Sequence, residues 1–174
     1  MSTGIAAETA GRESTMKIGG PFTLVDQDGQ AVTEATFEGR WLLVYFGFTF
    51  CPDVCPTALT RNISAIDLLG EQAEKITPVL ISVDPQRDSP EKLKDYVRFF
   101  HPRLVGLTGT PQQIASVAKE YRVFYVKSPG DTPETYLVDH SSLTYLIGPD
   151  GKFVEFFSHG LSAEEVANRL KQRL

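Results

Sequence analysis

Residues 41–60, WLLVYFGFTFCPDVCPTALT, constrain this chain more than any other stretch. The first six, 41–46, are bulky enough to form a strand that is buried on both faces. Pro56 suits the first turn of a helix, because proline has no N–H to lose there and its φ is already helical. The stretch therefore predicts a buried strand that runs into a helix, with the only two cysteines, Cys51 and Cys55, at the junction.

These two cysteines are the first candidates for a functional site. A helix N-terminus stabilises negative charge, so a thiol there is expected to have a lowered pKa and to be partly thiolate at neutral pH. The thiolate is the form that binds metal or attacks a disulfide. The alternatives are two small buried hydrophobic residues or one structural disulfide. A proline after each cysteine indicates an exposed chain reversal, and a disulfide across three intervening residues would add little stability.

The length of 174 residues predicts one domain with a full core. A net charge of −5 and the lack of a basic cluster argue against a nucleic-acid partner. No stretch approaches the ~20 apolar residues of a membrane span, and no signal peptide is visible. Residues 1–15 are small, polar and without periodicity, so we expect a flexible tail followed by one domain at 16–174.

The rest of the chain alternates between strand and helix patterns. Strands are expected at 41–46, 76–83, 104–107 and 123–126, hairpins around turns at 28–29 and 149–151, a loop at 128–135, and helices beginning near Pro56, Ser89, Thr110 and Ser162. The β-α-β order implies parallel strands, and the late hairpin adds antiparallel ones. This order predicts an α/β, thioredoxin-like fold: a mixed central sheet flanked by helices, with an added N-terminal β-hairpin.

Of the three histidines, His140 is the candidate ligand. It lies in the segment 139–142, at the entrance to an expected strand at 143–147. In a thioredoxin-like fold, the loop that enters this strand lies beside the cysteine junction, which is an argument from fold analogy. His101 suits a helix C-terminus, and His159 lies in a loop before the last helix, so neither is expected to bind metal.

Two thiolates and one imidazole form a soft set of three donors. A structural zinc site normally has four ligands and an iron–sulfur cluster usually needs four cysteines, so three donors favour copper. Zinc stays open as an alternative if Asp53, Asp84 or Asp139 supplies a fourth ligand.

Three segments together resemble the Sco/SenC family: TFCPDVCP at 49–56, SVDP at 82–85 followed by Arg87-Asp88 and Pro90, and Asp139-His140-Ser141. The resemblance covers about residues 18–174. It implies a copper-binding protein of cytochrome c oxidase assembly, with a thioredoxin-like fold and with Cys51, Cys55 and His140 as ligands of Cu(I) and Cu(II).

The same resemblance implies the cellular setting. The full-length protein would be anchored by one N-terminal helix and face the periplasm or the mitochondrial intermembrane space. Copper, reductant or both would pass to the dicopper (CuA) site of oxidase subunit II, with another copper chaperone as a further partner.

Two rival classes use the same cysteines. A thiol–disulfide oxidoreductase would use Cys51 and Cys55 as redox-active thiols, although the spacing is one residue longer than in CxxC. A peroxiredoxin is suggested by VCPT at 54–57, but it would need a threonine three residues before its cysteine and a proline seven before. Pro52 and Phe48 stand at those positions, so this class is disfavoured.

Overall fold

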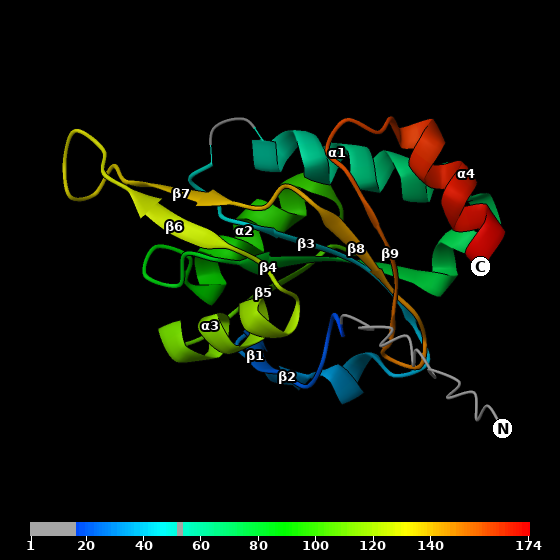
Figure 1. Ribbon diagram of the computed structural model, residues 1–174, viewed down its shortest axis with the longest axis horizontal. Helices are drawn as coiled ribbons and strands as arrows, with labels where there is room; N and C mark the ends of the chain where they lie inside the picture. Colours follow the sequence, from blue (N-terminus) through cyan, green and yellow to red (C-terminus); the bar gives the residue numbers. More distant parts are fainter. Residues whose placement is uncertain (1–16, 52–53) are drawn as a thin grey trace, which may run out of the picture.

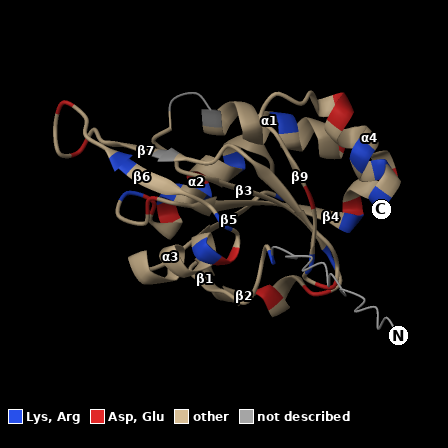
Figure 2. Ribbon diagram, viewed as in Figure 1, with Lys and Arg blue, Asp and Glu red and all other residues tan. Residues whose placement is uncertain are grey.

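The computed structural model describes residues 17–51 and 54–174 (Figure 1). The tail expected at 1–15 lies outside the described residues. Acidic and basic side chains are interspersed over most of the described elements (Figure 2).

In the described part of the chain, seven strands form one mixed sheet in the order β2-β1-β5-β4-β3-β8-β9. At its centre, β3 (Trp41–Gly47), β4 (Ile76–Ser82) and β5 (Val105–Thr108) run parallel. All of β4, and all of β3 after its first residue, is buried. The apolar runs that predicted these strands are therefore explained by helices on both faces of the sheet.

Within residues 17–51 and 54–174, four α-helices cover the sheet, and their packing confirms the α/β prediction. On one face, α1 (Val54–Asp67) lies beside α4 (Ala163–Arg173) and contacts α2 (Pro90–Phe100). Leu43 of β3 packs into the cluster between α1 and α4. On the other face, Phe46 packs against Tyr121, which directly follows α3 (Pro111–Glu120). The side chains of the three predicted capping residues, Ser89, Thr110 and Ser162, accept a backbone N–H at the starts of α2, α3 and α4.

Both predicted hairpins extend the sheet. The first consists of β1 (Thr23–Asp26) and β2 (Ala31–Thr33), and Gly29 takes a φ of +78° in its turn. Because β1 also pairs with β5, this hairpin lengthens one edge of the central sheet. The second consists of β8 (Thr144–Ile147), which pairs with β3, and β9 (Phe153–Phe157). Two short 3-10 helices, η1 (Glu34–Phe37) and η2 (Gly70–Lys75), precede β3 and β4.

A separate two-stranded sheet corrects the prediction for residues 123–142. β6 (Tyr125–Ser128) pairs antiparallel with β7 (Leu137–His140), and together they form an arm, the β6–β7 hairpin, that projects from the body (Figure 1). The sequence analysis placed His140 in a loop, whereas it is the last residue of β7. The segment was missed because a strand of four residues that ends in Asp139-His140 has no clear alternation, and only its pairing with β6 defines it.

Candidate metal centre

The two cysteines lie where β3 gives way to α1. Cys51 follows a turn in which its N–H donates to the Phe48 carbonyl at 3.3 Å. Cys55 lies in the first turn of α1, as predicted, and its backbone N–H donates to Cys51 Sγ at 3.4 Å. The sulfur of Cys51 therefore accepts one of the unpaired N–H groups of the helix start, as a capping side chain does.

His140 reaches this junction from the β6–β7 hairpin. Its Nε2 lies 3.3 Å from Cys55 Sγ, and its Nδ1 lies 2.8 Å from the Ser141 carbonyl oxygen. A carbonyl oxygen can only accept, so Nδ1 carries the proton and donates to it. This bond fixes the tautomer in which Nε2 has a lone pair directed at the sulfurs.

The structure thus brings together all three residues that the sequence singled out. Their ligand atoms, two Sγ and one imidazole nitrogen, lie within 4.8 Å of one another. Two sulfurs bound to one ion at ~2.3 Å each are at most roughly 4.6 Å apart, so a small contraction would place all three around an ion. Cys55 is buried, whereas Cys51 and His140 are half-buried.

Aromatic rings and a glycine shape the space around these atoms. Phe48 and Tyr45 both meet the His140 ring edge-on, with centroids 5.8 and 5.9 Å away. A Cβ added at Gly47 would lie 2.9 Å from Cys55 Sγ, so only glycine leaves room for the sulfur there. Sequence reasoning placed these residues in or beside a buried strand and missed their contact with the site, because their side-chain directions depend on the packing of α1 and β7.

The electrostatics of Cys55 contradict the sequence-based expectation. The hydrogen bond with Cys51 and burial of the sulfur raise the pKa of the Cys55 thiol. The bond with Cys51 and the burial together therefore outweigh the favourable field of the helix start at this position. The same surroundings, with the nearby sulfurs, raise the pKa of the Tyr45 hydroxyl. A bound cation would reverse the balance for the thiol, because it stabilises the deprotonated sulfur directly.

The remaining candidates lie apart from this cluster. His101 follows α2, and its Nδ1 accepts the backbone N–H of Arg103 at 3.0 Å. His159 is exposed in the turn between β9 and α4. Both carboxylate oxygens of Asp84 accept other bonds, from Arg87 and Tyr136, so Asp84 is not placed as a fourth ligand. Asp53 and the side chain of Asp139 lie outside the described residues.

Comparison with known proteins identifies relatives along most of the chain. The family model described as SCO1/SenC matches residues 10–174. The mitochondrial "Protein SCO1 homolog" of Homo sapiens is 45% identical over 152 residues, which are 86% of this chain and 50% of the human protein. The chain spans about half the length of the first curated relatives it matches, from Homo sapiens and Arabidopsis thaliana.

Solved structures of related proteins share the fold. The crystal structure of Arabidopsis thaliana ScoI with copper bound has a TM-score of 0.85 and 44% identity, covering 89% of this chain and 96% of that one. BsSco, described as a member of the Sco family of cytochrome c oxidase assembly proteins with a disulfide switch, has a TM-score of 0.70 and 25% identity, covering 90% of this chain and 93% of its own. These likenesses confirm the predicted thioredoxin-like fold.

Proposed function

Because the chain belongs to the SCO1/SenC family, we propose that it is a copper chaperone, which binds one copper ion through Cys51, Cys55 and His140 and delivers it to the CuA site in subunit II of cytochrome c oxidase. The approach of His140 Nε2 to within 3.3 Å of Cys55 Sγ carries the proposal. These atoms come from residues 85 positions apart, and thiol chemistry alone needs no imidazole there. The copper-bound state of Arabidopsis ScoI and the oxidase-assembly role named for BsSco support the metal and the acceptor.

The donor set favours copper over zinc. Thiolates select soft ions such as Cu(I), and imidazole suits both copper and zinc. A structural zinc site would need a fourth ligand, and within residues 17–51 and 54–174 the cluster of suitable donors contains three members. Three donors suffice for Cu(I), and one added oxygen donor would complete a Cu(II) site.

The residues of the site determine how copper enters. The raised pKa of Cys55 means that its sulfur holds a proton in the metal-free protein at neutral pH. Binding must displace the proton of the Cys55 thiol, so copper uptake releases a proton and strengthens as the pH rises.

The burial of the ligands determines how copper leaves. Cys55 is buried, whereas Cys51 and His140 are half-buried, so among the described residues the side of the last two is the more open to an acceptor. We expect acceptor sulfurs to replace Cys51 and His140 first, with Cys55 as the last ligand to release the ion.

The location and extent of the domain also belong to the proposal. We place the chain, as one copper-binding domain at 16–174, on the periplasmic side of a bacterial membrane or in the mitochondrial intermembrane space, held there by an anchor in the full-length protein. The mitochondrial and bacterial relatives support this setting. None of the described helices is long and apolar enough to cross a bilayer.

Copper titration of the reduced protein tests the ligand set. Wild type is expected to bind one Cu(I) per chain, and its Cu(II) form should show intense thiolate-to-metal charge-transfer absorption. His140→Ala should weaken binding while both thiols stay titratable. His101→Ala and His159→Ala are the matched controls, and equal loss of copper in all three variants would refute the assignment of His140.

A second function, reduction of the CuA-site cysteines, is favoured by the closeness of the two sulfurs. The Cys51 and Cys55 thiols would reduce an acceptor disulfide by exchange, passing two electrons and two protons and ending as a disulfide themselves. Delivery of copper to a reduced CuA fragment, run beside reduction of the oxidised fragment, separates the two roles. If His140→Ala loses delivery and keeps reduction, the chaperone proposal is supported; if it keeps both activities equally, copper delivery through His140 is refuted and reduction by the two cysteines is the better account.

A further inference from the structure

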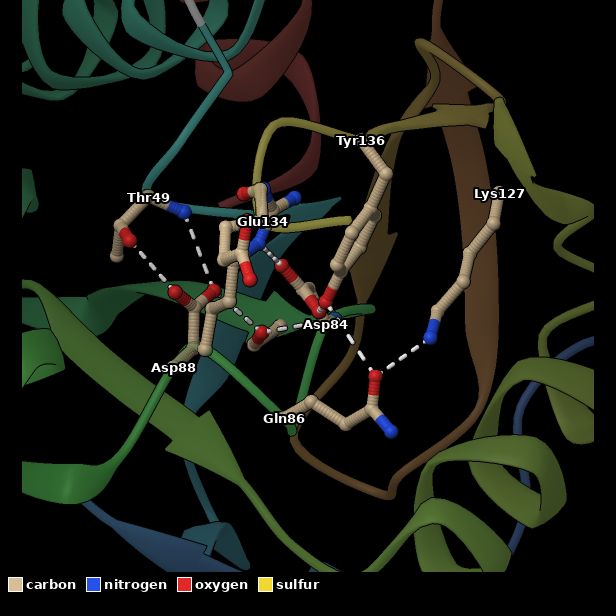
Figure 3. A network of polar contacts seen from close by, with 9 residues as sticks. Thr49, Asp84, Gln86, Asp88, Lys127, Glu134 and Tyr136 are labelled. Atoms are coloured by element: carbon tan, nitrogen blue, oxygen red, sulfur yellow. Dashed lines mark hydrogen bonds and ion pairs between the residues drawn. The ribbon is translucent and has the colours of Figure 1, made fainter. Parts of the chain in front are cut away.

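The loop of residues 84–88, between β4 and α2, is hydrogen-bonded to Thr49 on the cysteine side of the candidate metal centre and to Tyr136 on the His140 side (Figure 3). On the cysteine side, the buried carboxylate of Asp88 accepts the Thr49 hydroxyl at 2.5 Å and the Thr49 backbone N–H at 3.1 Å. Ser82, the last residue of β4, donates to the same carboxylate at 2.6 Å. Asp88 therefore fixes the segment that leads, two residues later, to Cys51.

Arg87 extends from this loop to the β6–β7 hairpin. The central carbon of its guanidinium lies 3.6 Å from the ring centroid of Tyr136 and 4.4 Å from that of Phe50, the residue before Cys51. Its Nε donates to Asp84 at 2.5 Å, and its Nη1 donates to the Glu134 carbonyl at 3.1 Å. The Arg87 side chain thus contacts three segments: the residue before Cys51, its own loop at 84–88, and the residues that precede β7.

Tyr136 completes the connection. It directly precedes β7, and its hydroxyl donates to the second oxygen of Asp84 at 2.5 Å (Figure 3). Because β6 and β7 form their own sheet, no ladder of backbone hydrogen bonds among the described residues joins this hairpin to the central sheet. The place of His140, the last residue of β7, therefore depends on side-chain contacts such as these.

We propose that Arg87 is a positioning residue of the metal centre, which holds the hairpin bearing His140 against the loop bearing Cys51. The inference rests on the proposed function only in taking His140 as a copper ligand. A planar guanidinium can stack against the two rings and donate to Asp84 and Glu134 at the same time, which a lysine ammonium cannot do.

An unpaired atom supports a role beyond stability. Arg87 Nη2 is buried and makes no hydrogen bond within the described part of the chain. An unsatisfied buried N–H group is destabilising, so local stability gives little reason for an arginine here. An arginine at position 87 is instead explained if it holds the segment before Cys51 and the segment before β7 together.

The test compares Arg87→Met with Arg103→Met. Arg103 also anchors backbone carbonyls, those of Ala73 and Ile76, but Ile76 begins β4 and so lies about 20 Å from the site end of that strand. Residues that orient metal ligands typically contribute 10–100-fold to affinity. We expect Arg87→Met to lower Cu(I) affinity by about this factor, and Arg103→Met to leave it unchanged.

A double-mutant cycle shows whether Arg87 acts through His140. In a His140→Ala background, Arg87→Met should have no further effect on affinity, because the ligand it positions is gone. An equal loss in both backgrounds would overturn the proposal. If Arg87→Met does not fold, Tyr136→Leu removes the hairpin side of the same contact and should give the same pattern.

A metal-free measurement separates this inference from the proposed function. In reduced wild type, NMR should show contacts between the ring protons of His140 and Phe48, whose centroids lie 5.8 Å apart. These contacts should be lost in Arg87→Met and kept in Arg103→Met. If they persist in Arg87→Met, the positioning role is wrong, whatever metal the protein binds.

Discussion

Gly47→Ala should weaken copper binding although residue 47 donates no ligand. The new Cβ would lie 2.9 Å from Cys55 Sγ, 3.1 Å from Tyr45 Cε1 and 3.3 Å from Leu80 Cδ1. Ordinary contact begins at 3.4 Å, so the sulfur must move by at least about 0.5 Å or the strand must shift. Ligand distances in metal sites hold within about 0.2 Å, so this displacement is enough to disturb the site.

The expected cost has two parts. Overpacking of a buried position typically costs about 1–3 kcal/mol in the free energy of unfolding, which lowers Tm by about 2–12 °C for a chain of this length. The misplaced sulfur should also reduce Cu(I) affinity by about 10–100-fold, as does the loss of a residue that orients a ligand. Competition titration with a Cu(I) chelator measures the affinity, and thermal unfolding of the metal-free protein measures the stability.

Gly106→Ala is the matched control. Its Cβ would lie 2.9 Å from Val97 Cγ1, the same overlap, but against α2 and not against a ligand. This variant should lose stability and keep its copper affinity. If Gly47→Ala binds copper as tightly as wild type, or if Gly106→Ala loses as much affinity, the reasoning about the sulfur's position fails.

Three further predictions concern the surroundings of the site. Oxidation that joins Cys51 to Cys55 should abolish Cu(I) binding, because both sulfurs are consumed; a titration of the oxidised protein that still shows tight binding would contradict this. Tyr45→Phe should raise the pKa of the Cys55 thiol further, because the Tyr45 hydroxyl hydrogen-bonds to that sulfur and favours its charged form, and titration of the thiols measures it. Burial raises the pKa of Asp88 above its ordinary 3.8, so its contribution to stability falls as the pH rises through the folded-state value; Asp88→Asn should remove this pH dependence, and parallel unfolding curves for the two proteins across this range would speak against it.

Much of the fold follows from local sequence signals. The apolar runs at β3 and β4 predicted buried parallel strands, and Ser89, Thr110 and Ser162 cap the helices as their positions indicated. These signals involve residues close together in the chain, so they can be read without knowledge of the fold. The cysteine pair was predictable for the same reason, since both residues belong to one strand–helix junction.

The parts that the sequence did not predict depend on contacts between distant residues. β7 exists because it pairs with β6, and Arg87 meets Tyr136 across 49 positions with no local pattern to indicate it. The pKa of Cys55 was expected to fall because the helix start was considered alone. The hydrogen bond with Cys51 and the burial of the sulfur raise it instead. Sequence reasoning placed His140 beside the cysteines through fold analogy and through the resemblance to the Sco/SenC family, and it gave the wrong secondary structure.

The separation of the β6–β7 hairpin from the central sheet makes the bound ion a cross-link within the chain. Copper held by Cys51, Cys55 and His140 would tie the end of this hairpin to the start of α1, so loading and docking of the hairpin are thermodynamically linked. This linkage is reciprocal. A partner that recognises the docked hairpin would bind the copper-loaded protein more tightly than the empty protein, and the partner would increase the protein's affinity for copper by the same factor. After the ion leaves, the hairpin loses this tie and the partner's affinity falls, so delivery of the cargo itself would promote release of the emptied carrier.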